Sequence, residues 1–351
     1  MSQTDLSSVA QALVAAGKGI LAADESAPTI KKRFDSIQVE SSEDNRRNYR
    51  EMLFTTDGAS EFISGVILFD ETLRQSSRAG KRLVDVLKDQ GVLSGIKVDK
   101  GAKDFALHAG EKCTEGLDGL RERLAEYAEL GATFAKWRAV ITIGDGIPSQ
   151  ACIDVNAHGL ARYAALCQEA GLVPIVEPEV LMDGTHTIET SACATGRALH
   201  ATFNELVRQG VDLSGMLLKP NMVLSGYGCD TQASVTEVAE ATVNCFRKHV
   251  PAAVPGIVFL SGGQDDELAT AHLDAMNRMD EGLRPWQLSF SYGRALQAPT
   301  LKAWGGKDDQ EADGQAAYLH RARMNGAARF GRWDASMEEG AQRGDTLVSQ
   351  D

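Results

Sequence analysis

Short apolar runs alternate with longer stretches of helical periodicity along the chain. Several runs are rich in Val and Ile and end abruptly in polar or charged residues, which is typical of parallel strands covered on both faces. Eight such runs span residues 19–26, 64–72, 95–101, 133–141, 172–180, 215–221, 256–263 and 287–294. They predict eight buried strands.

Amphipathic helices are predicted between these runs. The clearest cover residues 117–130, 154–170, 190–209 and 231–249. Regular strand–helix alternation predicts a parallel sheet with right-handed crossovers. Eight units over about 280 residues favour an α/β fold closed as a (β/α)8 TIM barrel over an open doubly wound sheet. No G-x-G-x-x-G follows an early strand, so a dinucleotide-binding fold lacks its sequence motif.

The chain contains no Pro-rich or Gly/Ser-rich linker, so residues 1–351 are interpreted as a single domain. Beyond residue 300 a polar segment is followed by a helical stretch at 316–330. Residues 331–351 have little apolar surface to bury, and we expect a mobile C-terminal tail there.

Composition narrows the class of partner. The 351 residues are 43% hydrophobic and 24% charged, as in soluble globular proteins, and the net charge is −13. That charge argues against nucleic acid or an acidic membrane as a partner. The N-terminus resembles no signal or transit sequence, and no apolar run is long enough to span a membrane. Six cysteines without a C-x-x-C pair suggest free thiols, so we expect a cytoplasmic protein.

Charged residues fall where the predicted strands end. In a TIM barrel the active site lies at the C-terminal ends of the strands, and a charge inside an apolar strand is costly unless it faces a polar cavity. Six of the eight runs carry such charges, namely Asp24, Lys97, Lys136 with Arg138, Glu177 with Glu179, Lys219, and Arg294. Period-two alternation places each of the two pairs on one strand face. Any one of these residues could instead form an ion pair that only fills the barrel mouth. The presence of the whole set at the strand ends favours an active site.

Lys219 is the strongest candidate for a nucleophile. It follows the apolar run Met-Leu-Leu, precedes Pro220, and is expected to lie partly desolvated near Lys136. Burial and a neighbouring cation both favour the neutral amine, which can form an imine with a ketone. The protonated imine would stabilise the carbanion left when an adjacent C–C bond breaks. Glu177 is then a natural proton carrier.

Two groups of residues suggest phosphate sites. Ser261, Gly262 and Gly263 end the seventh run, and Gly293 and Arg294 end the eighth, where many barrels bind a phosphate. A second group at the first and third runs comprises Ser26, Thr29, Arg33 and Lys97. Two anion sites flanking a reactive lysine suit a substrate that is phosphorylated at both ends. Lys31 and Lys32 are interpreted as part of a solvated helix face.

Several motifs resemble the Schiff-base, metal-independent (class I) fructose-1,6-bisphosphate aldolases. The motifs are GKGILAADES, GIKVDKG, FAKWRAV, GLVPIVEPEV, LLKPNMV, FLSGGQ and SFSYGRALQ. The resemblance extends from about Gly17 to Phe330. It implies reversible cleavage of fructose 1,6-bisphosphate to dihydroxyacetone phosphate and glyceraldehyde 3-phosphate, in glycolysis and gluconeogenesis. It also implies a phosphorylated sugar as the partner, no metal or other cofactor, and a homotetramer.

The resemblance assigns roles to individual residues. It implies that Lys219 forms the Schiff base, that Glu177 is the main acid/base with Glu179 in support, that Asp24 acts on the C4 hydroxyl, and that Lys136 stabilises charge. Substrate-binding positions implied are Arg138 beside Lys136, then Ser261, Gly262, Gly293 and Arg294 for the C1 phosphate, and Ser26, Thr29, Lys97 and Arg33 for the C6 phosphate.

One departure from the family concerns the C-terminus. Vertebrate members end in a tyrosine that helps to protonate the enamine intermediate, whereas this chain ends in TLVSQD and its last tyrosine is Tyr318. We therefore expect removal of residues 340–351 to change turnover less than in those relatives.

The sequence leaves open fructose 1-phosphate or sedoheptulose bisphosphate as the preferred substrate. A zinc-dependent aldolase would need a His/Glu/Asp cluster at strand ends, but the seven histidines fall mostly in predicted helices and loops. A barrel that has lost catalysis and acts as a binding or scaffold protein would be free to lose Asp24, Lys136, Glu177 or Lys219, yet all four are present.

Overall fold

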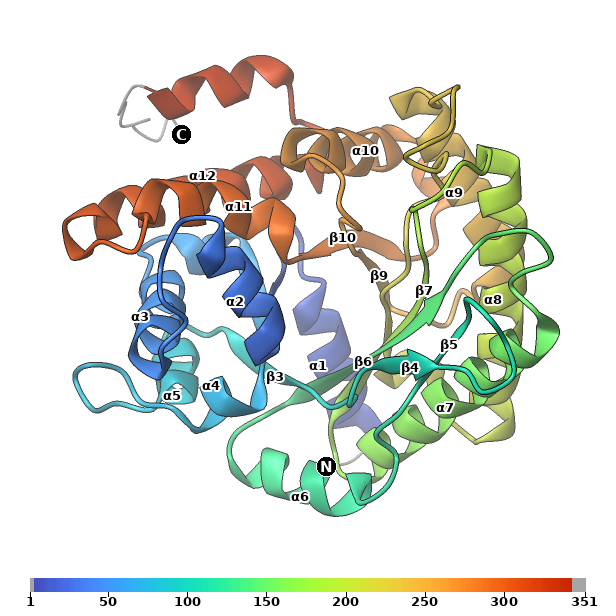
Figure 1. The fold of residues 1–351 in the computed structure, drawn as a ribbon, viewed down its shortest axis with the longest axis horizontal. Helices are drawn as coiled ribbons and strands as arrows, with labels where there is room; N and C mark the ends of the chain where they lie inside the picture. Colours follow the sequence, from blue (N-terminus) through green and yellow to red (C-terminus); the bar gives the residue numbers. More distant parts are fainter. Residues whose placement is uncertain (1–2, 343–351) are drawn as a thin grey trace.

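The computed structural model describes residues 3–342, and its centre is a closed barrel of parallel strands (Figure 1). Around the barrel the order is β1-β10-β9-β8-β7-β6-β3-β2. The barrel strands are β1 (Gly19–Ala23), β2 (Ile63–Leu68), β3 (Leu93–Lys97), β6 (Phe134–Ile141), β7 (Val173–Val180), β8 (Leu217–Leu218), β9 (Gly256–Phe259) and β10 (Gln287–Tyr292). The predicted eight-stranded TIM barrel is confirmed.

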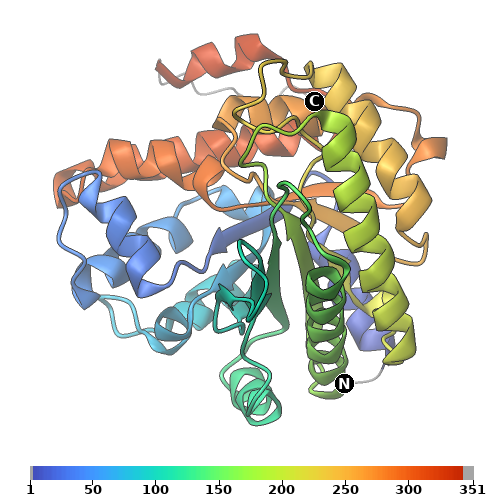
Figure 2. The same ribbon diagram turned by 45° about the vertical axis from the view of Figure 1, so that its right-hand side comes forward.

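Helices surround the strands, and Figure 2 shows two of the longest, α7 and α8, standing along the outside of the barrel. The helices are α1 (Gln3–Leu13), α2 (Ala27–Asp35), α3 (Glu43–Phe54), α4 (Asp70–Arg74), α5 (Leu83–Asp89), α6 (Leu120–Glu129), α7 (Gln150–Glu169), α8 (Ile188–Arg208), α9 (Val235–His249), α10 (Asp266–Arg278), α11 (Arg294–Trp304) and α12 (Glu311–Ala328). Short 3-10 helices are η1 (Ala59–Glu61), η2 (Leu213–Gly215), η3 (Glu281–Leu283), η4 (Asp308–Gln310) and η5 (Ala335–Gln342).

The four helices predicted most clearly correspond to α6, α7, α8 and α9. Polar residues fix where they begin. Ser149 accepts a hydrogen bond from the Cys152 N–H at the start of α7, and Ser234 forms a capping box with Glu237 at the start of α9. The sequence did not predict α1 as a helix or the antiparallel hairpin of β4 (Ala102–Asp104) and β5 (Lys112–Thr114).

Strand β8 is shorter than the predicted run at 215–221. The Lys219 N–H still donates to the Val176 carbonyl of β7 at 2.8 Å. Pro220 follows and has no N–H to donate, so the ladder stops there. The side chain of Asn221 takes over from the backbone ladder at this point, because its oxygen accepts a hydrogen bond from the Val180 N–H of β7 at 3.0 Å.

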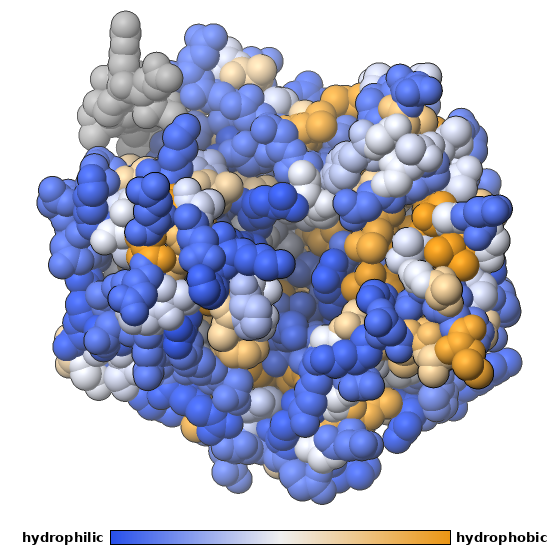
Figure 3. Space-filling model, viewed as in Figure 1, coloured by the Kyte–Doolittle hydropathy of each residue, from blue (hydrophilic) through white to orange (hydrophobic). Residues whose placement is uncertain are grey.

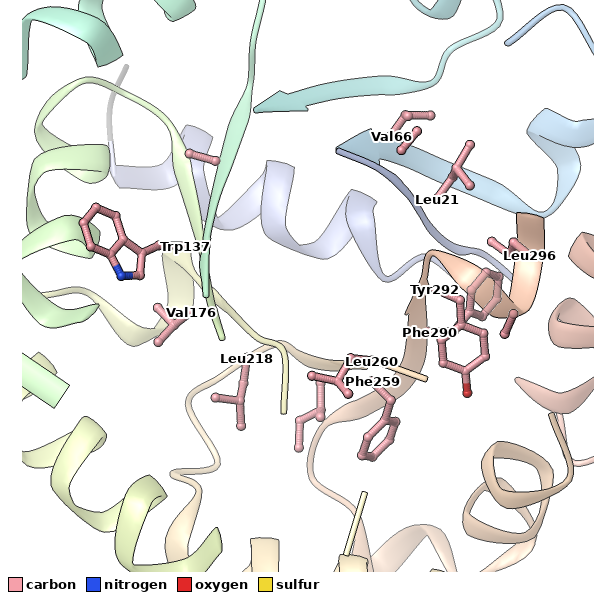
Figure 4. Close-up of a cluster of buried hydrophobic side chains, with 14 of the residues drawn as sticks. Leu21, Val66, Trp137, Val176, Leu218, Phe259, Leu260, Phe290, Tyr292 and Leu296 are labelled. Carbon is pink, nitrogen blue, oxygen red and sulfur yellow. The ribbon is translucent and has the colours of Figure 1, made fainter. Parts of the chain in front are cut away.

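Side chains alternate between two apolar layers. Those labelled in Figure 4, such as Trp137, Val176 and Phe259, encircle the barrel and pack in the layer between strands and helices. The opposite strand faces point inward and are apolar near the N-terminal ends, where Phe134 and Ile175 pack against Leu13 of α1 and its neighbours. Helix α1 therefore covers the N-terminal end of the barrel, and the C-terminal end is left for the polar residues that follow on the same faces.

The C-terminal segment was expected to be mobile from residue 331. In the part that the structure describes, η5 packs near α12, and Glu338 accepts hydrogen bonds from Arg321 (2.6 Å) and the Trp333 indole (2.8 Å). Burial would raise the pKa of Glu338, but hydrogen bonds from His320 and the charge of Arg321 lower it to about 2. Charge pairing thus holds a segment with little apolar surface, a feature that the composition did not predict. Residues 343–351 lie outside the described residues.

Within residues 3–342, no helix is long and apolar enough to cross a membrane. The six cysteines are all free thiols.

Candidate active site

A cavity of about 540 Å³ opens at the C-terminal ends of the barrel strands. Figure 3 shows a hollow near the centre of this face, bordered largely by hydrophilic residues. All the site residues predicted from the sequence line the cavity, namely Asp24, Ser26, Thr29, Arg33, Lys97, Lys136, Arg138, Glu177, Glu179, Lys219, Ser261, Gly262, Gly293 and Arg294. The structure therefore brings the whole predicted set together.

Glu177 lies between two lysines at the base of the cavity. Lys219 Nζ is 3.4 Å from Glu177 Oε1, and Lys136 Nζ is 3.3 Å from Glu177 Oε2. Lys136 Nζ also contacts Asp24 Oδ2 at 2.7 Å. The two lysines and Glu177 are buried, with Lys219 4% exposed. The sequence predicted Lys136 as the neighbour of Lys219, whereas the structure inserts a carboxylate between the two ammonium groups.

The charges of this cluster stabilise one another. Burial would raise the pKa of Asp24, but the ammonium groups of Lys136 and Lys219 outweigh that effect and hold the pKa well below its ordinary value. Burial would likewise lower the pKa of Lys136, and the carboxylates of Asp24 and Glu177 instead raise it above the ordinary lysine value. Near pH 7 the pair is therefore an aspartate and an ammonium ion.

Two further ion pairs lie along the cavity wall. Arg138 pairs with Glu179, one strand away on β7; burial opposes the charge of Arg138, but Glu179 raises its pKa. Lys97 donates to Asp99 Oδ1 at 2.6 Å. Asp99, which sequence reasoning did not single out, also accepts a hydrogen bond from the Arg138 N–H at 3.3 Å. It links the segment that follows β3 to Arg138 of β6.

The proposed C1-phosphate region is a glycine turn beside a helix N-terminus. Gly262 and Gly263 both have positive φ (60° and 101°), which explains why glycines follow Ser261. Arg294 is the first residue of α11 and extends across this turn, since a Cβ on Gly263 would lie 2.7 Å from Arg294 Nη2. Tyr227, which the sequence did not suggest, donates a hydrogen bond to the Gly262 carbonyl at 3.2 Å.

The second anion group lies around α2. Ser26 precedes this helix, and its hydroxyl is 3.1 Å from that of Thr29. Arg33 reaches the cavity from the last turn of the helix. Lys31 and Lys32 are exposed, and Lys31 pairs with Asp35, which agrees with the solvated face predicted for them.

A buried network behind this wall was missed by sequence reasoning. Glu25 directly follows Asp24 and also lines the cavity, where it pairs with Arg33 and with Arg50 (2.6 Å). Gln297 of α11 donates to Glu25 (2.8 Å) and to the Ala22 carbonyl. Glu25 thus joins the end of β1 to α2, α3 and α11.

Histidines contribute little to the cavity wall. His158 pairs with Glu205 between α7 and α8, and His320 pairs with Glu338. In the described part of the chain there is no group of three or more His, Cys, Asp or Glu residues arranged to hold a metal ion.

Comparison with known proteins gives the family. The family model for class-I fructose-bisphosphate aldolase matches residues 5–351. A probable fructose-bisphosphate aldolase class 1 of Xylella fastidiosa (strain 9a5c) is 57% identical over 336 residues, which is 95% of this chain and 99% of the relative. The chain belongs to the class-I fructose-bisphosphate aldolases.

Other class-I aldolases share the fold over nearly the same length. Cytosolic fructose-bisphosphate aldolase 4 of Arabidopsis thaliana is 55% identical over 327 residues, 93% of this chain and 83% of the relative. A solved structure of Plasmodium falciparum fructose-bisphosphate aldolase, in complex with TRAP and a small molecule inhibitor, has a TM-score of 0.93. It is 49% identical and covers 95% of this chain and 96% of that chain.

Membership in the class-I aldolase family confirms the resemblance seen in the motifs. The reaction of the family is the reversible aldol cleavage of fructose 1,6-bisphosphate, and the chain is accordingly a lyase of glycolysis. Membership in the class-I family excludes the alternative of a zinc-dependent aldolase, which belongs to another class. Loss of catalysis is not supported, because Asp24, Lys136, Glu177 and Lys219 meet in one cluster.

Proposed function

We propose that this aldolase acts through a Schiff base on Lys219, with Glu177 as its acid/base partner. The observation that carries the proposal is the contact of 3.4 Å between Lys219 Nζ and Glu177 Oε1 at the buried base of a cavity with cationic walls. A carboxylate at this distance can remove a proton from the ammonium group and so supply the neutral amine that attacks a ketone.

The reaction then follows from the positions of the groups. The Lys219 amine attacks C2 of the open-chain ketose, and the C2 oxygen leaves as water after protonation by Glu177. Asp24 takes the proton from the C4 hydroxyl while the C3–C4 bond breaks. The electron pair of the C3–C4 bond moves into the iminium and gives an enamine. Glyceraldehyde 3-phosphate leaves. The enamine then takes up a proton from water at C3, and Asp24 returns its proton to the solvent. Hydrolysis of the imine releases dihydroxyacetone phosphate and restores the Lys219 amine.

Lys136 and Glu179 support these steps. Lys136 contacts both Asp24 and Glu177, so its charge offsets the negative charge on either carboxylate as protons move. Glu179 holds Arg138 at the cavity wall.

The two phosphates of the substrate are assigned to opposite walls. For the phosphate on C1 we assign Ser261, Gly262, Gly293 and Arg294. For the phosphate on C6 we assign Ser26, Thr29, Arg33 and Lys97, with Arg138 beside the sugar chain. Local cations are needed here, because the chain as a whole carries a net charge of −13 and repels anions.

A homotetramer in the cytoplasm is part of the proposal. The resemblance to the family supports the assembly, and two Arabidopsis relatives with cytosolic in their names support the compartment. Sedimentation equilibrium should give the mass of four chains of 37.7 kDa each. The mass of one or two chains would reject the tetramer without affecting the chemistry.

Cleavage by variants of the purified chain tests the mechanism. Lys219→Met should abolish formation of triose phosphates from fructose 1,6-bisphosphate, measured with a chelator present throughout. Lys31→Met is the matched control, because Lys31 is an exposed lysine paired only with Asp35 in the described part of the chain, and it should retain full activity. Substantial cleavage by Lys219→Met, or loss of wild-type activity on chelation, would reject the proposal.

A further inference from the structure

Two buried polar residues behind the glycine turn, Gln264 and His272, take no part in the proposed chemical steps. Gln264 ends the turn and is 4% exposed. His272 lies on α10, the helix that follows the turn, and is 2% exposed. His272 Nδ1 lies 2.6 Å from Gln264 Oε1. Gln264 Nε2 also lies 3.6 Å from Met222 Sδ. A buried polar pair whose groups are hydrogen-bonded fixes the conformation of the groups that it joins.

Gln264 holds one particular peptide group. Both its backbone N–H and its side-chain Nε2 donate to the carbonyl oxygen of Ser261, each at 3.0 Å. The carbonyl and the N–H of a trans peptide point in opposite directions. Because the Ser261 carbonyl is turned toward buried Gln264, the N–H of Gly262 in the same peptide is turned away from it, to the side of the cavity that Ser261 and Gly262 line.

His272 fixes the orientation of the Gln264 amide. Gln264 Oε1 can only accept, so His272 Nδ1 must carry the hydrogen and donate it. Burial lowers the pKa of His272 to about 4, so the ring is neutral near pH 7 and keeps this donor without bringing a charge into the core. With the oxygen of the amide held by His272, its NH₂ group faces Ser261.

We propose that His272 and Gln264 are positioning residues that aim the Gly262 N–H at the C1 phosphate of the substrate. The chain of contacts runs from the His272 ring to the Gln264 amide, then to the Ser261 carbonyl and the peptide that ends in the Gly262 N–H. Neither side chain touches the substrate. The proposal rests on the assignment of the Ser261–Gly262 turn to the C1 phosphate.

Fructose 1-phosphate is the probe, because it carries only the phosphate that this turn is proposed to bind. His272→Leu removes the donor while keeping a buried side chain, and should raise KM for fructose 1-phosphate about tenfold with kcat changed less than about twofold. His272→Asn places an amide donor near the position of Nδ1 and should restore most of the lost KM. Gln264→Met removes the other half of the pair and should also raise KM about tenfold. It provides the test if His272→Leu does not fold.

Thr270→Val is the matched control. Thr270 is buried on the same helix, but its hydroxyl donates to Asn325 of α12 rather than toward the turn, so KM should stay at the wild-type value. Equal effects on kcat and KM in all variants, or no rescue by asparagine, would show a merely structural role and overturn the inference. Ser261→Ala separates the two levels. An unchanged KM in Ser261→Ala would reject the phosphate assignment itself. A raised KM in Ser261→Ala together with a wild-type KM in His272→Leu would reject only the positioning role.

Discussion

The ammonium nitrogen of Lys219 lies 3.4 Å from Oε1 of Glu177, with both side chains buried at the C-terminal ends of adjacent barrel strands. The two residues come from β7 and from the end of β8, and the pairing of these strands sets their spacing. A proton can pass between them without a large movement of either side chain, which is the property that imine formation and hydrolysis require.

Replacing Glu177 by Gln should therefore remove proton transfer while keeping the shape of the site. We expect kcat to fall by about 10²- to 10⁴-fold with little change in KM, since the phosphate-binding residues are untouched. Steady-state kinetics on fructose 1,6-bisphosphate measure this. A large rise in KM with kcat preserved would mean that Glu177 binds substrate rather than moving protons.

Asp24→Asn should change how stability depends on pH. The pKa of Asp24 is lowered in the folded protein, so its contribution is fully present above the ordinary value of 3.8 and is lost as pH falls toward the folded pKa. The pKa of Lys136 is raised, so its contribution is lost only above the ordinary 10.5. The wild type should be more stable than the variant by about 2 kcal/mol from about pH 5 to about pH 9, and the difference should shrink below about pH 4.

Urea unfolding of both proteins at several pH values measures the difference in free energy of unfolding. A difference that does not shrink in acid would mean that the charge of Asp24 contributes nothing to the folded state.

The buried pair of Glu25 and Arg50 should be costly to break from one side. Arg50→Met removes one of the cations that pair with the buried carboxylate of Glu25. We expect the free energy of unfolding to fall by about 3 kcal/mol. The double variant Glu25→Gln/Arg50→Met removes both charges and should be more stable than the sum of the single changes predicts. Additive effects in this double-mutant cycle would show that the two residues do not interact.

Removal of residues 340–351 should leave turnover largely intact. The last tyrosine of the chain, Tyr318, is buried in α12, where its phenol pKa is raised by burial, so it does not replace a terminal tyrosine. Glu338, which anchors η5, is retained in the shortened chain. A kcat within about threefold of the full chain is expected from steady-state kinetics. A large loss of rate would place a catalytic group in the removed segment.

The core of the site could be predicted from the sequence because one rule connects it to the fold. Residues two and four positions beyond an inward-facing apolar residue share its strand face, so Lys136 follows Phe134 and Glu177 follows Ile175 into the barrel mouth. Prediction failed where contacts join distant segments. Glu25 meets Gln297 across 272 residues of chain, and no local pattern indicates such a pair.

Residues that act through the backbone were also beyond sequence reasoning. Asn221 extends the pairing of the short strand β8 by accepting a hydrogen bond from the Val180 N–H. In the sequence His272 is an ordinary helical residue, and only its contact with Gln264 distinguishes it. Their importance depends on which peptide groups lack a partner, and this is known only once the strands have been placed.

Borohydride trapping of the imine shows which lysine carries the Schiff base. The chain is incubated with dihydroxyacetone phosphate, reduced with borohydride, digested and mapped by mass spectrometry, with Lys219→Arg as a control that keeps the charge. We expect one stable adduct, on the peptide containing Lys219, and none in the control. Lys136 is the informative alternative, because its ammonium group lies 3.3 Å from the other oxygen of Glu177. An adduct on Lys136 or any other lysine, or no adduct on an active enzyme, would mean that Lys219 does not form the Schiff base.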